Sequence, residues 1–294
     1  MAVGAKAIRN RIRSIKNTSK ITKAMELVSA NKMRKASRMA VGGRAYDLSL
    51  SEIIKGIARD RSLKGQFFYN EGEERKEIKN VLVILFSGNR GLCGSFNSSI
   101  INFAKRAIKE KMASEEIGRA WIAIGKKGLE DLARSGEKID AEFKKIESGE
   151  ASEDFWTIGK FVTEEFVSGK FDEVWIAYTD FVSPLKQIPR LNRLLPIKRE
   201  SSDSDEMQAE EIYFEPGKEE LLSYLVPRLI ETKLYQALLE SNASEHSSRM
   251  VAMKNASDAC RDITDELVFE SNELRQAGIT REIIEIAGAK SALG

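Results

Sequence analysis

Residues 8–36, IRNRIRSIKNTSKITKAMELVSANKMRKA, decide the fold because they form the centre of one long helical pattern. No proline occurs between Ala5 and about Arg59, and apolar residues recur three and four positions apart, as on one face of a helix. Despite Gly42 and Gly43, we predict a single helix of about 80 Å at 1.5 Å per residue. The expected stripe contains Ile8, Ile12, Ile15, Ile21, Met25, Val28, Met33, Ala36 and Ala40, then Tyr46, Leu50, Ile53 and Ile57.

The other end of the chain offers a partner of similar length. From Lys218 onward only Pro227 interrupts a second helical run, near enough to its start to be a first-turn or kink residue. Heptad spacing relates His246, Met253, Cys260, Leu267 and Leu274, with Ala243, Met250, Ala256 and Ile263 between them. We predict an antiparallel coiled coil of residues 1–60 with residues 216–294. Small residues should allow the helices to approach closely at Ala243, Ser244, Ser247, Ala252, Ala256, Ser257 and Ala259.

The middle of the chain has the pattern of an α/β domain. Short apolar runs at residues 81–86, 120–124 and 174–178 predict buried strands, and helical stretches at 99–112, 128–133 and 155–167 separate them. The three prolines within residues 181–197 indicate extended edge or hairpin structure, and the acidic stretch 200–211 is expected to be a mobile loop. The predicted fold class is α/β, a long antiparallel coiled coil with a Rossmann-like domain inserted at residues 76–215.

Composition excludes several classes of protein. A length of 294 residues with 42% hydrophobic and 31% charged residues allows one large domain or two modest ones. The longest apolar run is of strand length, far short of the roughly 20 residues that cross a bilayer. The N-terminus lacks an apolar signal core, so we expect a mature cytoplasmic chain. Cys93 and Cys260 are too few and too far apart in sequence for a disulfide scaffold or zinc site.

The net charge of the chain is only +2, but its N-terminal segment is strongly basic. In the first 45 residues Glu26 is the single acid, and it faces Lys6, Arg9, Arg11, Arg13, Lys16, Lys20, Lys23, Lys32, Arg34, Lys35, Arg38 and Arg44. Such a segment favours an acidic partner. Nucleic acid is the rival partner, but no aromatic residue precedes Tyr46 to stack on bases. A merely solvated helix face is the third interpretation.

The candidate chemical motifs do not form a catalytic site. The stretch GNRGLCG at residues 88–94 follows a strand, but its glycines are spaced three and three, unlike a dinucleotide-binding loop. Cys93 has no catalytic histidine, because His246 occupies a seam position and has no neighbouring metal-ligand pattern. Gly125 and Gly128 lack the rest of a phosphate-binding loop. We therefore expect no catalytic residue, cofactor or metal, and we expect the glycines to form a tight strand-to-helix turn that permits close packing by other chains.

Three stretches of the sequence carry a family resemblance: IRNRIRSIKNTSKITKAMELV at 8–28 with KMRKA at 32–36, RGLCGSFN at 90–97, and ASEHSSRMVAMKNASD at 243–258 with RQAGITREIIEI at 275–286. They resemble the gamma subunit of F-type ATP synthases. The resemblance implies a non-catalytic rotor shaft that couples ion flow, taken as proton flow, to ATP synthesis or hydrolysis at other subunits.

The resemblance also implies partners and contact residues. The expected partners are the alpha and beta subunits of the catalytic ring, the epsilon subunit and the membrane c-ring, in a hetero-oligomer without nucleic acid. The complex would lie on the cytoplasmic face of a bacterial inner membrane, with this chain peripheral. Residues expected to contact the stator are Met25, Lys32, Arg34, Lys35, Arg38, Arg249, Arg275, Gln276 and Thr280. The competing hypotheses are a basic coiled-coil nucleic-acid binder and a nucleotide-dependent enzyme with helical arms.

Overall fold

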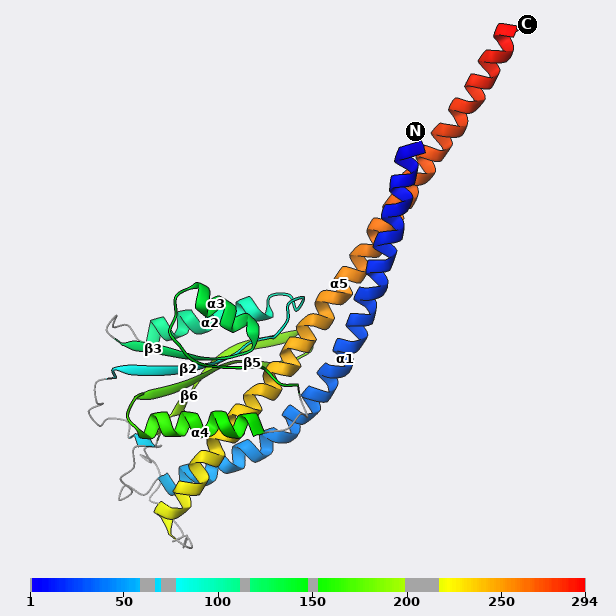
Figure 1. The fold of residues 1–294 in the computed structure, drawn as a ribbon. Helices are drawn as coiled ribbons and strands as arrows, with labels where there is room; N and C mark the ends of the chain where they lie inside the picture. The colour runs from blue at the N-terminus through cyan, green and yellow to red at the C-terminus, as the bar shows by residue number, and fades with distance from the viewer. Residues whose placement is uncertain are drawn as a thin grey trace. The chain divides into compact units, whose positions relative to one another are not determined.

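The structure is a computed structural model, and it describes residues 2–58, 67–69, 78–111, 117–147, 153–198 and 217–293. The chain forms two compact units, one of Met1–Ala30 with Arg249–Gly294 and one of Asn31–Ser248. Two long helices, α1 (Ala2–Ala58) and α5 (Lys218–Leu293), each contribute to both units (Figure 1). In the part of the chain that is described, none of the helices is both long and apolar enough to span a bilayer.

A five-stranded sheet forms the centre of the Asn31–Ser248 unit. Its strand order is β4-β3-β2-β5-β6. The strands are β2 (Asn80–Phe86), β3 (Gly118–Ile124), β4 (Ile139–Phe143), β5 (Glu173–Ser183) and β6 (Lys186–Leu195). The first four are parallel, and β6 pairs antiparallel with β5. Two short strands, β1 (Phe68–Tyr69) and β7 (Ile197–Lys198), form a separate parallel pair.

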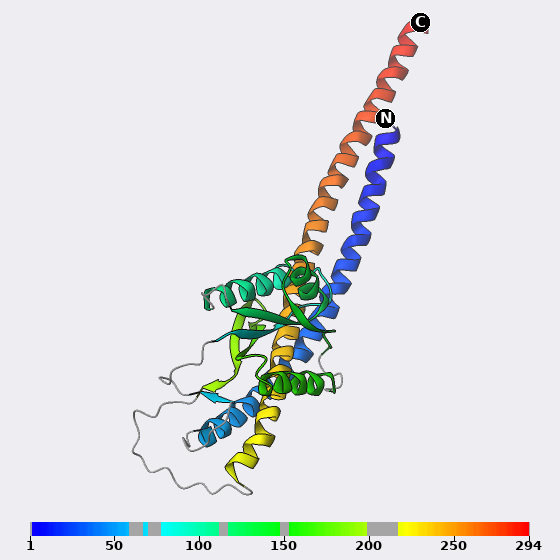
Figure 2. The same ribbon diagram turned by 60° about the vertical axis from the view of Figure 1, so that its left-hand side comes forward.

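Helices cover both faces of this sheet, which explains why its strands are apolar at consecutive positions (Figure 2). Val81, Val83 and Leu85 of β2 point into one apolar core with α2 (Phe96–Lys111) and α3 (Lys126–Arg134). Leu82, Ile84 and Phe86 point into the other core, with α4 (Glu153–Val167) and the first part of α5. Alternate side chains of one strand thus bind the sheet to two different layers.

The predicted elements are largely confirmed. Both terminal helices form, the three predicted strands correspond to β2, β3 and β5, and the three predicted helices correspond to α2, α3 and α4. Residues 181–197 form the predicted hairpin, between β5 and β6. The edge strand β4 was not predicted, because IDAEF is only partly buried and lacks a continuous apolar run. The acidic stretch 200–211 lies outside the described residues, and the domain boundaries 1–60, 76–215 and 216–294 remain a prediction.

In the unit of Met1–Ala30 with Arg249–Gly294, the two helices lie side by side and antiparallel (Figures 1 and 2). The predicted stripe is wrong in its central part, since Ile21 is 61% exposed and Val28 is 55% exposed. Thr22 and Ser29 are buried instead. They continue a heptad spacing that begins at Ile8, Ile12 and Ile15.

On α5, too, residues with hydroxyl side chains occupy buried seam positions where apolar residues were predicted. Met253 and Leu267 are buried as predicted, but Ile263 is 40% exposed and Leu274 is 37% exposed. Ser257 and Thr264, at the heptad positions that follow Met250, are buried. The seam hydroxyls bond to their own helix, for example Thr264 Oγ1 to the Cys260 carbonyl at 2.7 Å and Ser29 Oγ to the Met25 carbonyl at 2.7 Å. Small side chains with satisfied hydroxyls can therefore occupy a seam that the apolar period alone does not reveal.

In the Asn31–Ser248 unit, α1 and α5 pack through both apolar and polar contacts. Leu50 and Ile54 of α1 form a small core with Leu229 of α5. The predicted stripe is wrong at Tyr46 and Ile53, which are more than half exposed. The Gln236 amide donates to the Ala40 carbonyl at 3.0 Å, and Lys233 Nζ lies 2.8 Å from Asp47 Oδ2.

Candidate functional site: the polar junction of α5 and the exposed helical surface

Eight consecutive residues of α5, from position 240 to 247, are buried on every side of the helix. All of them except Ala243 are polar: Glu240, Ser241, Asn242, Ser244, Glu245, His246 and Ser247. A helix segment that is polar and buried all round must satisfy its side chains with partners from several directions. We call this segment with its partners the junction. Of the small residues predicted to allow close approach, Ala243, Ser244 and Ser247 are buried here, and the two serines bond to the β5–β6 hairpin.

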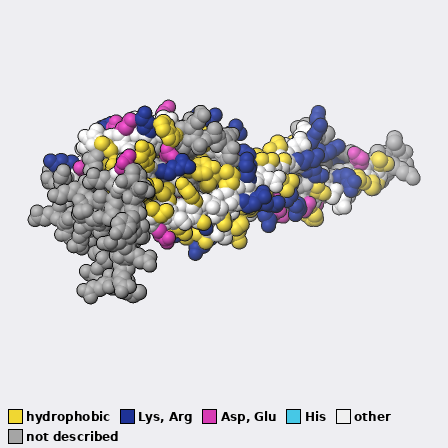
Figure 3. All heavy atoms as spheres, turned by 90° about the horizontal axis from the view of Figure 1, so that it is seen from below, with side chains coloured by type: hydrophobic (Ala, Val, Ile, Leu, Met, Phe, Trp, Pro, Cys, Tyr) yellow, Lys and Arg dark blue, Asp and Glu magenta, His cyan; other side chains and the backbone are white. Residues whose placement is uncertain are grey.

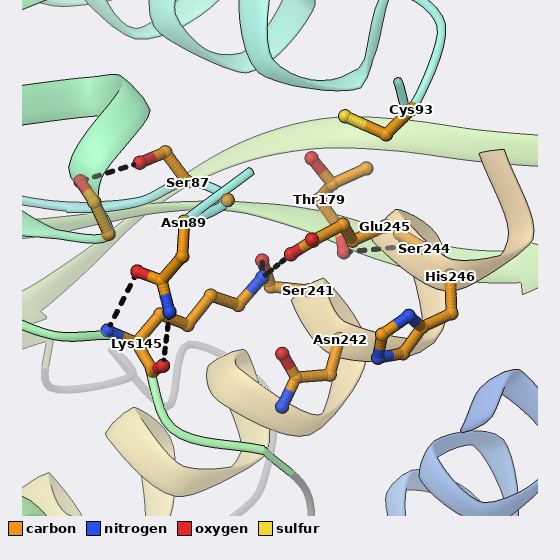
Figure 4. A network of polar contacts seen from close by, with 12 residues as sticks. Ser87, Asn89, Cys93, Lys145, Thr179, Ser241, Asn242, Ser244, Glu245 and His246 are labelled. Atoms are coloured by element: carbon orange, nitrogen blue, oxygen red, sulfur yellow. Dashed lines mark hydrogen bonds and ion pairs between the residues drawn. The ribbon is translucent and has the colours of Figure 1, made fainter. Parts of the chain in front are cut away.

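The junction partners come from the loop after β2, the segment after β4 and the β5–β6 hairpin, and Figure 4 shows Cys93, Lys145 and Thr179 among them. From the loop between β2 and α2, the Cys93 carbonyl accepts a bond from Ser248 Oγ at 2.6 Å. From the segment after β4, the Ile146 carbonyl accepts from Asn242 Nδ2 at 3.0 Å. In the β5–β6 hairpin, the Thr179 carbonyl accepts from Ser244 Oγ at 3.1 Å, and the Pro184 carbonyl from Ser247 Oγ at 2.6 Å.

A buried ion pair lies at the centre of the junction. Lys145 Nζ lies 2.8 Å from Glu245 Oε2 and 3.0 Å from Ser241 Oγ, and the lysine side chain is only 2% exposed. The ammonium also lies 5.2 Å from the centroid of the Phe96 ring. Asn89 holds the lysine backbone, donating to the Lys145 carbonyl at 2.6 Å and accepting from its N–H at 3.3 Å (Figure 4).

A second charged cluster links α1, α5 and the segment after β4. Glu147 Oε2 lies 3.1 Å from His246 Nε2, and Glu147 Oε1 lies 2.8 Å from Lys32 Nζ. The hydrogen bond with His246 is the largest cause that lowers the pKa of Glu147, and the bond from Lys32 adds to it against the opposing effect of burial. Together they lower this pKa to about 2. His246 is thus buried at the seam as predicted, but it also has a polar partner.

A third cluster surrounds Glu240. Arg44 Nε donates to Glu240 Oε1 at 2.9 Å, and the Phe181 N–H donates to Glu240 Oε2 at 3.1 Å. The hydrogen bond to Glu240 is the first cause that raises the pKa of Arg44. Nearby, burial raises the pKa of Tyr178 to about 12, with the charges of Asp180 and Glu240 acting in the same direction. Arg44 and Tyr178 therefore keep their ordinary charge states at neutral pH.

The glycine motif that follows β2 is a tight turn that admits α5. Gly94 has φ of +56°, and a Cβ there would lie 3.2 Å from Ser248 Oγ. A Cβ on Gly88 would lie 3.2 Å from the Glu245 Cδ. The sequence predicted a tight turn that permits close packing by other chains, whereas in the structure α5 of this same chain packs against Gly88 and Gly94. Within the described ranges, no group of three or more His, Cys, Asp or Glu is arranged to hold a metal ion.

The predicted contact residues fall into three groups. Arg34, Lys35 and Arg38 are exposed on α1 of the Asn31–Ser248 unit, as is Lys32 with its ion pair to Glu147. In the other unit Met25 and Arg249 are half-buried, and Arg275, Gln276 and Thr280 are exposed on α5.

The last turns of α5 extend past the start of α1 and carry exposed Ile279, Ile283, Ile284 and Ile286 (Figures 1 and 2). These isoleucines were not among the predicted contact residues, although their helical spacing is present in the sequence.

Basic side chains gather along the helical pair in Figure 3. Lys6, Arg9, Arg11, Arg13, Lys16, Lys20 and Lys23 of α1 are all exposed. The α5 segment of the same unit carries more acids than bases, including exposed Asp258, Asp262 and Asp265. The basic charge of α1 is therefore partly balanced within its own unit.

Comparison with known proteins identifies the family. The chain matches the ATP synthase family over residues 4–293. It is 39% identical over 292 residues to the ATP synthase gamma chain of Roseiflexus castenholzii, with 97% of each chain covered. It is 36% identical over 292 residues to the ATP synthase gamma chain of Cytophaga hutchinsonii, with 98% of each chain covered.

Solved structures agree with this assignment. A chain from the central stalk and c-ring of the Tetrahymena thermophila mitochondrial ATP synthase is 25% identical with a TM-score of 0.58, covering 81% of this chain and 99% of that one. A chain of the Euglena gracilis mitochondrial ATP synthase shares the fold, with a TM-score of 0.68 at 18% identity, covering 100% of this chain and 95% of that one. The resemblance found in the sequence is thereby confirmed, and the chain belongs to the ATP synthase gamma chain family.

Proposed function

We propose that this chain is the central rotor shaft of an F-type ATP synthase and couples proton flow to ATP synthesis or hydrolysis at other subunits. The chain itself carries out no chemistry in this proposal, but regulates ATPase activity and proton flow through its rotation. The single observation that carries the proposal, beyond family membership, is the construction of α5. One unbroken helix of 76 residues contributes to both compact units and is held against the α/β sheet by the buried junction.

This construction suits the transmission of torque. A helix fixed only by apolar contacts can slide and turn, because the hydrophobic effect is not directional. Hydrogen bonds and ion pairs have defined partners and geometry. The junction places such bonds between α5 and three separate loops. Force applied to the sheet would therefore reach α5, which continues without a break into the second unit.

The partners follow from the same proposal. The α/β sheet would stand on the membrane c-ring, together with the epsilon subunit, while the helical pair would lie inside a ring of alpha and beta subunits. The matched Tetrahymena chain comes from a central stalk and c-ring, which supports this arrangement. The chain would be peripheral, on the cytoplasmic face of a bacterial inner membrane.

The contacts with the stator would use two kinds of surface. Exposed Arg34, Lys35 and Arg38 would face acidic loops of the catalytic subunits, while Met25, Arg249, Arg275, Gln276 and Thr280 would contact them from the other unit. The half-buried state of Met25 and the exposure of Arg275 are compatible with such roles. Lys32 is a weaker candidate, because Glu147 already binds its ammonium at 2.8 Å.

Reconstitution tests the proposal directly. Alpha and beta subunits should assemble with this chain in a defined complex, and ATP-driven ion pumping in vesicles should require it. A nucleic-acid binder would instead retain polynucleotide with a steep salt dependence. Failure to assemble with the catalytic subunits, together with salt-dependent polynucleotide binding, would refute the shaft proposal and favour the rival.

A further inference from the structure

Loss of the Lys145–Glu245 pair would leave an unpaired buried charge, whereas loss of a hydroxyl or amide contact of the junction would not. The serine and asparagine side chains of α5 donate to backbone carbonyls, and a hydroxyl that loses one acceptor can turn to another. Lys145 and Glu245 have side-chain exposures of only 2% and 9%. Separating such a pair leaves an uncompensated charge in a poorly solvated place, which is strongly unfavourable.

The surrounding residues fix where this pair can form. Asn89 bonds to both the N–H and the carbonyl of Lys145, so the backbone that carries the ammonium is held by the loop after β2. Gly88 leaves room for the Glu245 carboxyl, since a Cβ there would lie 3.2 Å from its Cδ. Ser241 lies one turn earlier on α5 and accepts from the same ammonium at 3.0 Å. The lysine therefore contacts α5 at two successive turns of one face.

A second buried carboxylate constrains a different face of α5. Glu240 precedes Glu245 by five residues, which places the two side chains about 140° apart around the axis at about 100° per residue. Glu240 is held by Arg44 of α1 and by the Phe181 N–H of β5. A rotation of α5 about its axis would draw both carboxylates away from their partners at once.

From these contacts we infer that the buried Lys145–Glu245 pair is a positioning element that fixes the rotational setting of α5 against the α/β sheet. This inference rests on the proposed function, because its consequence is the stiffness with which torque passes from sheet to helix. Lys145 and Glu245 touch no substrate and act only through the orientation of α5. The Glu240 cluster holds a different face of the helix through Arg44 and the Phe181 N–H.

Two variants separate positioning from simple stabilisation. Glu245→Gln keeps the side-chain shape and leaves Lys145 without its carboxylate. The double variant Lys145→Met with Glu245→Leu removes both charges, and replacement of a buried ion pair by apolar residues is commonly neutral or stabilising. Glu130→Gln is the matched control, because Glu130 pairs with Lys127 within α3 of the same unit, where both side chains are partly exposed.

The measurement is the torsional stiffness of the chain in its complex with alpha and beta subunits. A bead attached through Lys109→Cys on α2, in a chain that also carries Cys260→Ala, reports angular fluctuations while the catalytic subunits are held on a surface. We expect Glu245→Gln and the double variant each to increase the angular variance roughly twofold, because α5 loses its directional contact. The double variant should keep the melting temperature of the parent chain, and the Glu130→Gln control should change neither quantity.

The outcomes distinguish the inference from the function on which it rests. Unchanged angular variance in both variants, in complexes that assemble and rotate, would overturn the positioning role and leave the shaft proposal standing. A variance that increases only in proportion to a lower melting temperature would also overturn it, since that is the behaviour of a purely stabilising pair. A parent chain that neither assembles nor rotates would refute the proposed function instead.

Discussion

The carboxylate of Glu147 lies 3.1 Å from His246 Nε2, and this contact joins the segment after β4 to the buried part of α5. The same carboxylate accepts from Lys32 of α1 at 2.8 Å. Glu147 therefore bridges the two long helices of the Asn31–Ser248 unit, although its own side chain is 47% exposed.

This bridge predicts a stability change in acid. The folded-state pKa of Glu147 is about 2, against an ordinary value of 4.5, so its stabilisation is complete above pH 4.5 and is lost as the pH falls toward 2. Solvent screening of a half-exposed carboxylate limits the effect to about 1 kcal/mol or less. In urea unfolding, Glu147→Gln should be less stable than the parent chain at pH 7, and the difference should shrink at about pH 3. An equal difference at both pH values would contradict the assignment.

The adjacent glycines of α1 predict opposite responses to the same substitution. A Cβ on Gly42 meets nothing within 4 Å, so Gly42→Ala should stabilise the helix by about 0.5–1 kcal/mol. A Cβ on Gly43 would lie 2.6 Å from Gln236 Oε1. Moving this side chain would disturb its bonds to the Ala40 carbonyl and to Glu240, at about 1 kcal/mol each. In thermal unfolding, the melting temperature of Gly42→Ala should be higher than that of Gly43→Ala. The reverse order would show that the close contact at Gly43 is absent.

The exposed basic residues of α1 separate three interpretations. Neutralising Arg34, Lys35 and Arg38 together to Gln should weaken assembly or torque most at low ionic strength, and the difference from the parent chain should shrink at high salt, where the Debye length falls to about 3 Å at 1 M. Lys32→Gln alone should act mainly on stability, because Lys32 is paired with Glu147. Assembly yield and ATP-driven pumping at low and high salt measure both effects. Parental behaviour of the triple variant at both salts would support a solvated face, and lost polynucleotide affinity would support the nucleic-acid interpretation.

Met25 is half-buried in the unit of Met1–Ala30 with Arg249–Gly294, and its substitution tests rotation. Met25→Lys adds an ammonium to a region already rich in basic residues, and that charge must find a carboxylate on a neighbouring subunit. The new ion pair would add a rotational barrier on the order of 1 kcal/mol or more. ATP hydrolysis should persist while pumping per ATP hydrolysed falls, and Met25→Leu should behave as the parent chain. Equal pumping ratios for the lysine and leucine variants would refute this contact.

The sequence predicted the strands and helices well where burial follows an apolar period. The run at 81–86 reads as a strand covered on both faces, and that is its environment in β2. The seam of the helical pair was harder, because Thr22, Ser29, Ser257 and Thr264 are buried while Ile21 and Ile263 are exposed. Hydroxyls such as those of Thr22 and Thr264 bond within their own helix, so burial leaves no apolar signal.

The junction could not be predicted from local patterns. Glu240 and Glu245 resemble ordinary exposed helix acids in the sequence, and their partners Arg44 and Lys145 lie far away along the chain. Only the sheet topology brings the segment after β4 beside α5. The small residues near Ala243 were a usable signal for close packing, but the sequence did not show that Ser244 and Ser247 would bond to the β5–β6 hairpin.

Rotation of this chain inside its complex tests the central claim most directly. With alpha and beta subunits fixed to a surface and a bead attached to α2 through the Lys109→Cys substitution, addition of ATP should drive sustained rotation in one direction, and ATP removal should stop it. A stable complex that hydrolyses ATP while the bead shows only undirected fluctuation would contradict the account of this chain as a rotor shaft.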